Sequence, residues 1–146
     1  MNPINFVHSN LAVLMGRTGH GQPTRARLRG RLVAYLQSVY QHEHMVLAVY
    51  QGLALRATHP TQRDLLLNLA QDEARRLERW ADIFQQLGAS APADRQALSA
   101  RAWQQMLVYL GPRCALAWIT WVKKRDFHRL TRMLKTLRAD RMLSAG

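Results

Sequence analysis

The stretch TRARLRGRLVAYLQSVYQHEHMVLAVYQGLALRATHPTQRDLLLNLAQDEARRLERWADIFQQLG (residues 24–88) decides the fold, because it holds two long helical patterns in succession. In each pattern apolar residues recur at three- and four-residue steps, as on the buried face of a bundle helix. They are Leu32, Leu36, Val39, Val46, Tyr50 and Leu53, then Leu66, Leu69, Trp80, Ile83 and Leu87. With Thr24 as cap, His59-Pro60 as breaker and Gly88 as C-cap, we predict helices over about 24–58 and 61–87.

Charged residues fall on these apolar faces. Glu43 lies between Val39 and Val46, and Glu73 and Arg76 lie inside the second stripe. Burying a carboxylate without a partner costs several kcal/mol, so each glutamate needs a cation or a metal ion. The groups that neutralise the two glutamates are therefore the main functional question of this sequence.

Two further helices are expected, over about 94–110 and 112–143, separated by Gly111-Pro112. The buried candidates are Leu98, Ala102, Met106, Leu107 and Leu110 in the first, and Leu116, Ile119, Leu130, Met133 and Leu137 in the second. Lys123 and Asp126 complete the face of the last helix. Because no strand pattern competes, the sequence predicts an all-α, antiparallel four-helix bundle over residues 24–146.

Residues 1–23 form an appendage to this bundle, a short amphipathic segment followed by the glycine-rich connector GRTGHGQP (16–23). The segment is too short to be a stable helix alone, so we expect it to dock on its own bundle or on a partner, with a membrane surface as the alternative.

Length and composition indicate a single-domain protein without disulfides or membrane-spanning segments. At 146 residues the chain is long enough for one domain with one core, and its single cysteine, Cys114, excludes an intramolecular disulfide and fits a reducing compartment. Neither a signal-peptide pattern nor an apolar run of about 18 residues is present. We expect a cytoplasmic location, free or at the cytoplasmic face of a membrane.

The net charge of +12 is unevenly distributed and favours an anionic partner. All of the expected partner-binding residues lie on the last helix: Lys124, Arg125, Arg129, Arg132, Lys135 and Arg138, with Trp118 and Trp121. The acids concentrate between Asp64 and Asp82. Tryptophans beside a basic run are typical of interfacial helices. Because Trp118 and Trp121 only partly share a face, we expect one in the core and the other at a partner or a lipid headgroup region.

Three segments carry a family resemblance. HEHMVLAVYQGLA (42–54), LLLNLAQDEARRLERWADIFQQLG (65–88) and YLGPRCALAWITWVKKRD (109–126) resemble ferritin-like, rubrerythrin-like domains, most closely those attached to vacuolar-iron-transporter-type membrane proteins. The resemblance implies a ferritin-like bundle, in which two iron ions lie between glutamates and histidines. Glu43 matches the ligand of the first helix, and Glu73 matches the first residue of the E-x-x-H motif.

The chain departs from this family at the metal ligands. Arg76 stands at the histidine of E-x-x-H, and Lys123 stands where the last helix has a glutamate, with Asp126 three residues on. A guanidinium cannot lose its proton at physiological pH, so it cannot bind a metal ion. We therefore predict a degenerate di-iron site, a buried polar cluster of Glu43, Glu73, Arg76, Lys123 and Asp126 in which the two cations replace the irons and no cofactor binds.

The leading hypothesis is a non-catalytic accessory or scaffold subunit that docks its basic surface on an acidic or membrane-embedded protein complex, with contact to anionic lipid and a homodimer left open. The first alternative is an iron-binding protein or di-iron oxidase with a reduced ligand set, in which Glu43, His44 and Glu73 hold iron. The second is a nucleic-acid-binding helical protein that uses the basic last helix.

Overall fold

The computed structural model describes residue 5, residues 23–92 and residues 98–143, and the side chains at 23–25 and 140–143 are left out of that description. Four long helices make up the described chain: α3 (Pro23–Arg56), α4 (Pro60–Gln86), α5 (Leu98–Leu110) and α6 (Pro112–Leu143). The prediction of an all-α bundle of four helices is confirmed. The N-terminal appendage, apart from residues 5 and 23, lies outside the described residues, as does the predicted start of the third helix at 94.

The helices end at the residues that the sequence marks. Gly88 has a φ of 65°, a left-handed conformation that favours glycine. The amides of Gly88 and Ala89 donate to the carbonyls of Gln85 and Phe84 at 3.1 and 3.0 Å, which is the paired hydrogen bonding of a Schellman motif. Pro60 and Pro112 open α4 and α6, where the missing amide hydrogen costs nothing.

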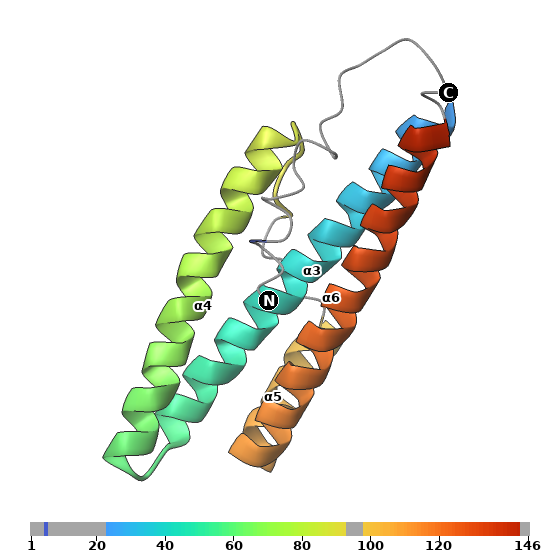
Figure 1. Ribbon diagram of the computed structural model, residues 1–146. Helices are drawn as coiled ribbons and strands as arrows, with labels where there is room; N and C mark the ends of the chain where they lie inside the picture. Colours follow the sequence, from blue (N-terminus) through green and yellow to red (C-terminus); the bar gives the residue numbers. More distant parts are fainter. Residues whose placement is uncertain (1–4, 6–22, 93–97, 144–146) are drawn as a thin grey trace.

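Helix α3 is the centre of the bundle and packs against the other three helices, with α4 on one side and α6 on the other (Figure 1). The core is divided into two apolar clusters. One holds residues of all four helices: Val46, Val49, Leu53, Leu66, Leu107, Ile119 and Val122. The other holds residues of α3, α4 and α6: Leu32, Leu36, Val39, Trp80, Phe84, Leu130 and Leu134. Buried charged residues separate the two clusters along each of these three helices.

Helix α5 contributes less to the core than we predicted. Only Leu107 and Val108 are buried in this helix. Leu98, Ala102, Met106 and Leu110 are exposed, so the predicted buried face was largely wrong. The physical reason is that α5 is a short helix that packs mainly on α3 and α6, through one of its sides. The other apolar side chains of α5 are consequently on the surface.

The contact between α3 and α5 depends on Gly52. A Cβ at this position would lie 2.8 Å from Val108 Cγ2, and valine has little rotamer freedom with which to move away. We expect Gly52→Ala to push α5 outward and to lower the free energy of unfolding by about 1–3 kcal/mol, more than the roughly 1 kcal/mol that alanine adds to helix stability.

Gly30→Ala is the matched control, because Gly30 also lies inside α3 and a Cβ there meets nothing within 4 Å. This variant should be more stable than the wild type by about 0.5–1 kcal/mol. Urea unfolding of both variants measures the difference, and Val108→Ala should restore stability to Gly52→Ala. Equal stabilisation by the two glycine substitutions would contradict the close contact.

Candidate functional site

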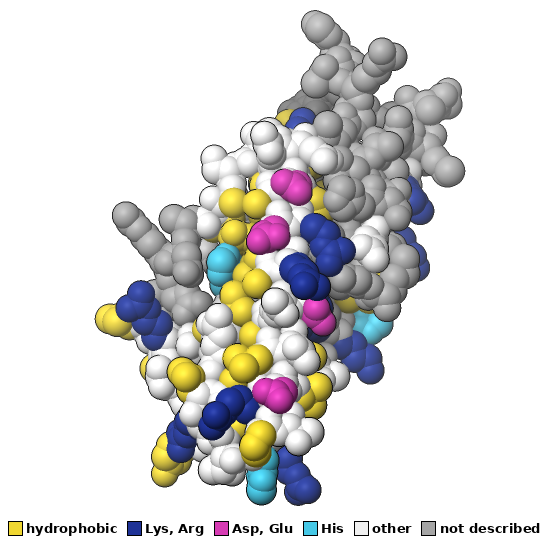
Figure 2. All heavy atoms as spheres, turned by 90° about the vertical axis from the view of Figure 1, so that its left-hand side faces the viewer, with side chains coloured by type: hydrophobic (Ala, Val, Ile, Leu, Met, Phe, Trp, Pro, Cys, Tyr) yellow, Lys and Arg dark blue, Asp and Glu magenta, His cyan; other side chains and the backbone are white. Residues whose placement is uncertain are grey.

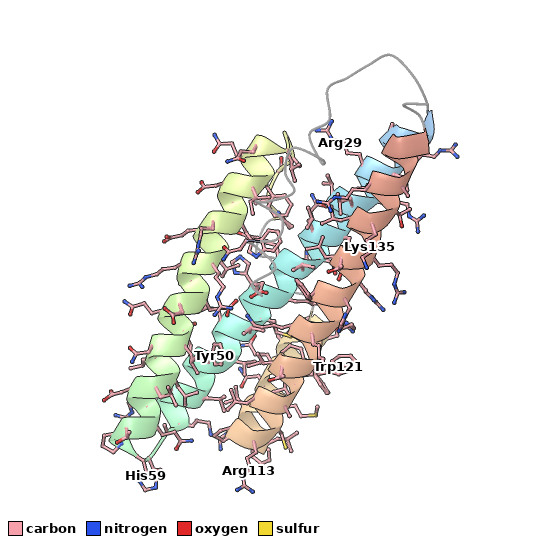
Figure 3. All side chains as sticks on the ribbon, viewed as in Figure 1. Arg29, Tyr50, His59, Arg113, Trp121 and Lys135 are labelled. Atoms are coloured by element: carbon pink, nitrogen blue, oxygen red, sulfur yellow. The ribbon has the colours of Figure 1, made fainter. Side chains whose placement is uncertain are left out.

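Two glutamates lie in the middle of the bundle with almost no solvent contact. Glu43 of α3 is 4% exposed and Glu73 of α4 is 0% exposed. Along α3, Glu43 lies between Val39 of one cluster and Val46 of the other, and along α4, Glu73 lies between Ala70 and Trp80. These positions share the buried side of each helix, so helical spacing alone turns both glutamate side chains inward. Tyr50, one of the surrounding aromatic residues, lies near the gap between the α3 and α4 ribbons (Figure 3).

Lys123 of α6 neutralises this pair. Its Nζ donates to Glu43 Oε2 and to Glu73 Oε2, both at 2.9 Å. The lysine side chain is 22% exposed, so it enters from the edge of the bundle and places its charged end between the two carboxyl groups. Arg76 contributes a longer contact, 3.6 Å from Nη1 to Glu73 Oε2. The structure thus brings together four of the five residues of the predicted polar cluster.

The two carboxyl groups differ in protonation. Burial, together with a hydrogen bond to Glu73, raises the pKa of Glu43 to about 8, although Lys123 opposes the shift. Burial also acts to raise the pKa of Glu73, but the hydrogen bond from Glu43 and the charge of Lys123 outweigh it and leave that pKa lowered. Glu73 Oε1 is buried and has no hydrogen-bond partner among the described residues. At neutral pH the pair therefore holds one proton and one negative charge, which faces Lys123.

Asp126 belongs to a second, adjacent polar group. His42 Nδ1 lies 2.8 Å from Asp126 Oδ2, and the Tyr35 hydroxyl donates to the Asp126 carbonyl oxygen at 2.9 Å. Arg125 Nε lies 3.7 Å from Asp126 Oδ1. Burial and the charge of Asp126 raise the pKa of Tyr35. Asp126 is 4% exposed, and its partners are mainly side chains of α3. The prediction that Arg76 or Lys123 pairs with Asp126 was therefore wrong.

Tyr35 and His42 are site residues that were not predicted, although the sequence contains a signal for them. Tyr35, Val39, His42 and Val46 recur at steps of four, three and four residues, so both polar side chains continue the buried stripe of α3.

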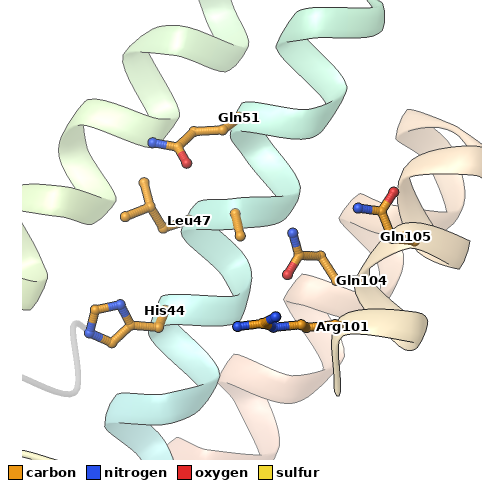
Figure 4. Close-up of a pocket in the computed structure, with 7 residues that line it drawn as sticks. His44, Leu47, Gln51, Arg101, Gln104 and Gln105 are labelled. Atoms are coloured by element: carbon orange, nitrogen blue, oxygen red, sulfur yellow. The ribbon is translucent and has the colours of Figure 1, made fainter. Parts of the chain in front are cut away.

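His44 lies away from the glutamate pair. It lines a groove of about 310 Å³ between α3 and α5 (Figure 4). The other lining residues are Leu47, Ala48 and Gln51 of α3 and Arg101, Gln104 and Gln105 of α5. Across the described parts of the chain, no three histidine, cysteine, aspartate or glutamate side chains lie close enough together to hold a metal ion. The donors present near Glu43 and Glu73 therefore do not fit a di-iron centre.

No family model matches this chain, and neither the curated proteins nor the solved structures contain a match to it.

The expected partner-binding residues lie on the outside of α6. All six basic residues of this set are at least partly exposed, and Trp121 is 56% exposed, with its ring 4.6 Å from the guanidinium of Arg125. Trp121 points away from the bundle (Figure 3), whereas Trp118 packs against the core and contacts Trp103. No helix among the described residues is long and apolar enough to cross a membrane.

The exposed acids lie on a different side of the molecule. Asp64, Asp72, Glu78 and Asp82 are all exposed residues of α4. Figure 2 views the α4 side and shows acidic side chains along its length, with arginines beside several of them. Because α4 and α6 flank α3 on opposite sides (Figure 1), the basic surface of α6 is separate from the mixed surface of α4.

Proposed function

We propose that this protein is a non-catalytic, ferritin-like antiparallel bundle that works as an accessory or scaffold subunit and docks the basic surface of α6 on an acidic or membrane-embedded protein complex. The observation that carries the proposal is the position of Lys123 Nζ, 2.9 Å from a carboxylate oxygen of each buried glutamate. An ammonium group at this place has the electrostatic role that a metal ion has in a carboxylate-rich bundle, and it has no redox chemistry.

The charge of the site supports the same conclusion. A di-iron centre needs several carboxylates and histidines to balance the metal charge. Here Glu43 holds a proton, and Lys123 and Arg76 already face the single negative charge of Glu73. A divalent ion would have to displace the lysine and would be repelled by the arginine. We therefore assign a structural role to the buried group of Glu43, Glu73 and Lys123, and a partner-binding role to the basic surface of α6.

Iron binding tests the first half of the proposal. The full chain, purified and incubated anaerobically with ferrous iron, should retain less than about 0.1 iron per chain after desalting, because no donor set can hold the ion. The double variant Arg76→His/Lys123→Glu replaces both cations with metal-binding side chains and should retain more iron than the wild type. Near-stoichiometric iron in the wild-type protein would overturn the proposal in favour of an iron-binding function.

Docking on an acidic protein tests the second half. A photo-crosslinking amino acid at position 129 of α6 should give a discrete adduct in native membranes. The captured protein, once purified, should bind the chain with an affinity that falls as salt rises. Arg129→Gln/Arg132→Gln should weaken this binding, while Arg75→Gln/Arg79→Gln on α4, with the same loss of charge, should not. Equal losses from both pairs would show that only net charge matters.

A further inference from the structure

The exposed apolar residues of the structure concentrate on α5 and the first half of α6. Trp103, Met106, Tyr109 and Leu110 of α5 are exposed, as are Leu116 and Trp121 of α6. The Trp103 ring lies 6.4 Å from the Trp118 ring, so aromatic side chains connect the two helices. Single exposed apolar residues are ordinary, whereas several of them on two neighbouring helices favour a contact surface.

The same surface is basic and has no exposed acid. From residue 98 to residue 139, the exposed side chains of α5 and α6 include arginines and lysines but no aspartate or glutamate, because Asp126 is buried. With 100° of rotation per residue, several α6 side chains point within about 60° of a single outward direction. They are Trp121, Lys124, Arg125, His128, Arg132 and Lys135. A tryptophan and a row of cations therefore share one outward face.

We propose that this face of α5 and α6 lies on the headgroup region of an anionic lipid bilayer, with Trp121 and the apolar residues of α5 at the level of the headgroups and the α6 cations on lipid phosphates and carboxylates. The inference rests on the proposed docking function and names the surface that brings the bundle to a membrane-embedded partner.

The chemistry of the face favours lipid over the other anionic partners. Indole rings prefer the headgroup region, where an apolar ring and a polar N–H are both accommodated. Arg125 lies over the Trp121 ring, so the guanidinium and the indole are presented together rather than on separate faces. Each cation near an anionic bilayer adds about 1 kcal/mol, a factor of about five in affinity.

The experiment uses the full chain and vesicles of neutral phosphatidylcholine, with or without about one third phosphatidylserine. The chain should co-sediment with the anionic vesicles and detach at high salt. Arg132→Gln/Lys135→Gln should weaken binding about thirtyfold, since two charges are removed. The matched control is Arg75→Gln/Arg79→Gln on α4, which loses the same charge from two exposed residues and should change binding less than threefold.

Tryptophan fluorescence gives an independent readout. Bilayers with brominated acyl chains should quench part of the emission. The double variant Trp103→Phe/Trp121→Phe should remove most of that quenching, whereas Trp80→Phe, at a buried position, should not. Circular dichroism shows whether each variant is folded. Equal binding to neutral and anionic vesicles, equal losses from the α4 and α6 pairs, or binding to RNA with none to vesicles would each overturn the inference. So would a dimer that shields Trp121 from the quencher. None of these outcomes affects the iron test, so the two proposals can fail separately.

Discussion

Lys123→Ala is expected to lower the free energy of unfolding by about 3–5 kcal/mol at pH 8, because it leaves two buried carboxyl groups without their cation. Glu43 and Glu73 then have only the longer contact of Arg76, 3.6 Å from Glu73, as compensation. The loss should be smaller at pH 5, where both carboxyl groups can take up protons and avoid a buried charge. Urea unfolding at the two pH values measures the effect.

Lys124→Ala is the matched control, since Lys124 is an exposed neighbour on the same helix. Its free energy of unfolding should stay within about 0.5 kcal/mol of the wild type. The triple variant Glu43→Leu/Glu73→Leu/Lys123→Met should recover most of the stability, because apolar residues of similar size can replace a buried ionic group without loss. If both lysine variants have the same stability at pH 8, the lysine does not bridge the glutamates.

The stability of the protein is expected to fall as pH rises from about 5 to 8, owing to Glu43. The pKa of this residue is 4.5 when it is unperturbed and about 8 in the folded chain. Between these values the folded state binds one proton more than the unfolded state, so the contribution of Glu43 is complete below pH 4.5 and is lost through pH 8. The slope reaches about 1.4 kcal/mol per pH unit. Glu73, with a lowered pKa, acts in the opposite sense and destabilises only in acid.

Glu43→Gln isolates this effect, because the amide keeps the size of the side chain and cannot ionise. The difference in unfolding free energy between the wild type and Glu43→Gln should change steadily over pH 5 to 8. Asp72→Asn is the control, since Asp72 is an exposed carboxyl on α4 and its removal should leave the slope unchanged. Parallel curves for the wild type and Glu43→Gln would show that Glu43 is not protonated in the fold.

Residues that begin or end helices, together with the apolar pattern within each helix, made much of the fold predictable. Pro60, Gly88 and Gly111-Pro112 are residues whose backbone requirements end or open helices, so the helix limits could be read within a few positions. Glu43 has apolar residues one turn away on each side, which was enough to expect its burial. These features depend on one helix at a time.

The details that the sequence left undetermined depend on how helices rotate against one another. Asp126 finds its partners on α3, in His42 and Tyr35, because α6 turns that side chain toward the first helix. The buried side of α5 is Leu107 and Val108 because Gly52 lets α5 approach α3 there. Neither fact follows from the spacing of residues within a single helix. Each of them determines which side chains stay exposed and can contact a partner.

The ionic pair between the two apolar clusters also determines how the helices align along their length. Leucine and valine stripes tolerate a sliding shift, since one apolar side chain can replace another after a turn of 5.4 Å. A slide of α6 by that distance would take Lys123 Nζ out of reach of both glutamates, which it now contacts at 2.9 Å. Lys123 thus selects one register among several that hydrophobic packing alone would allow, much as a single polar residue fixes the register of a coiled coil.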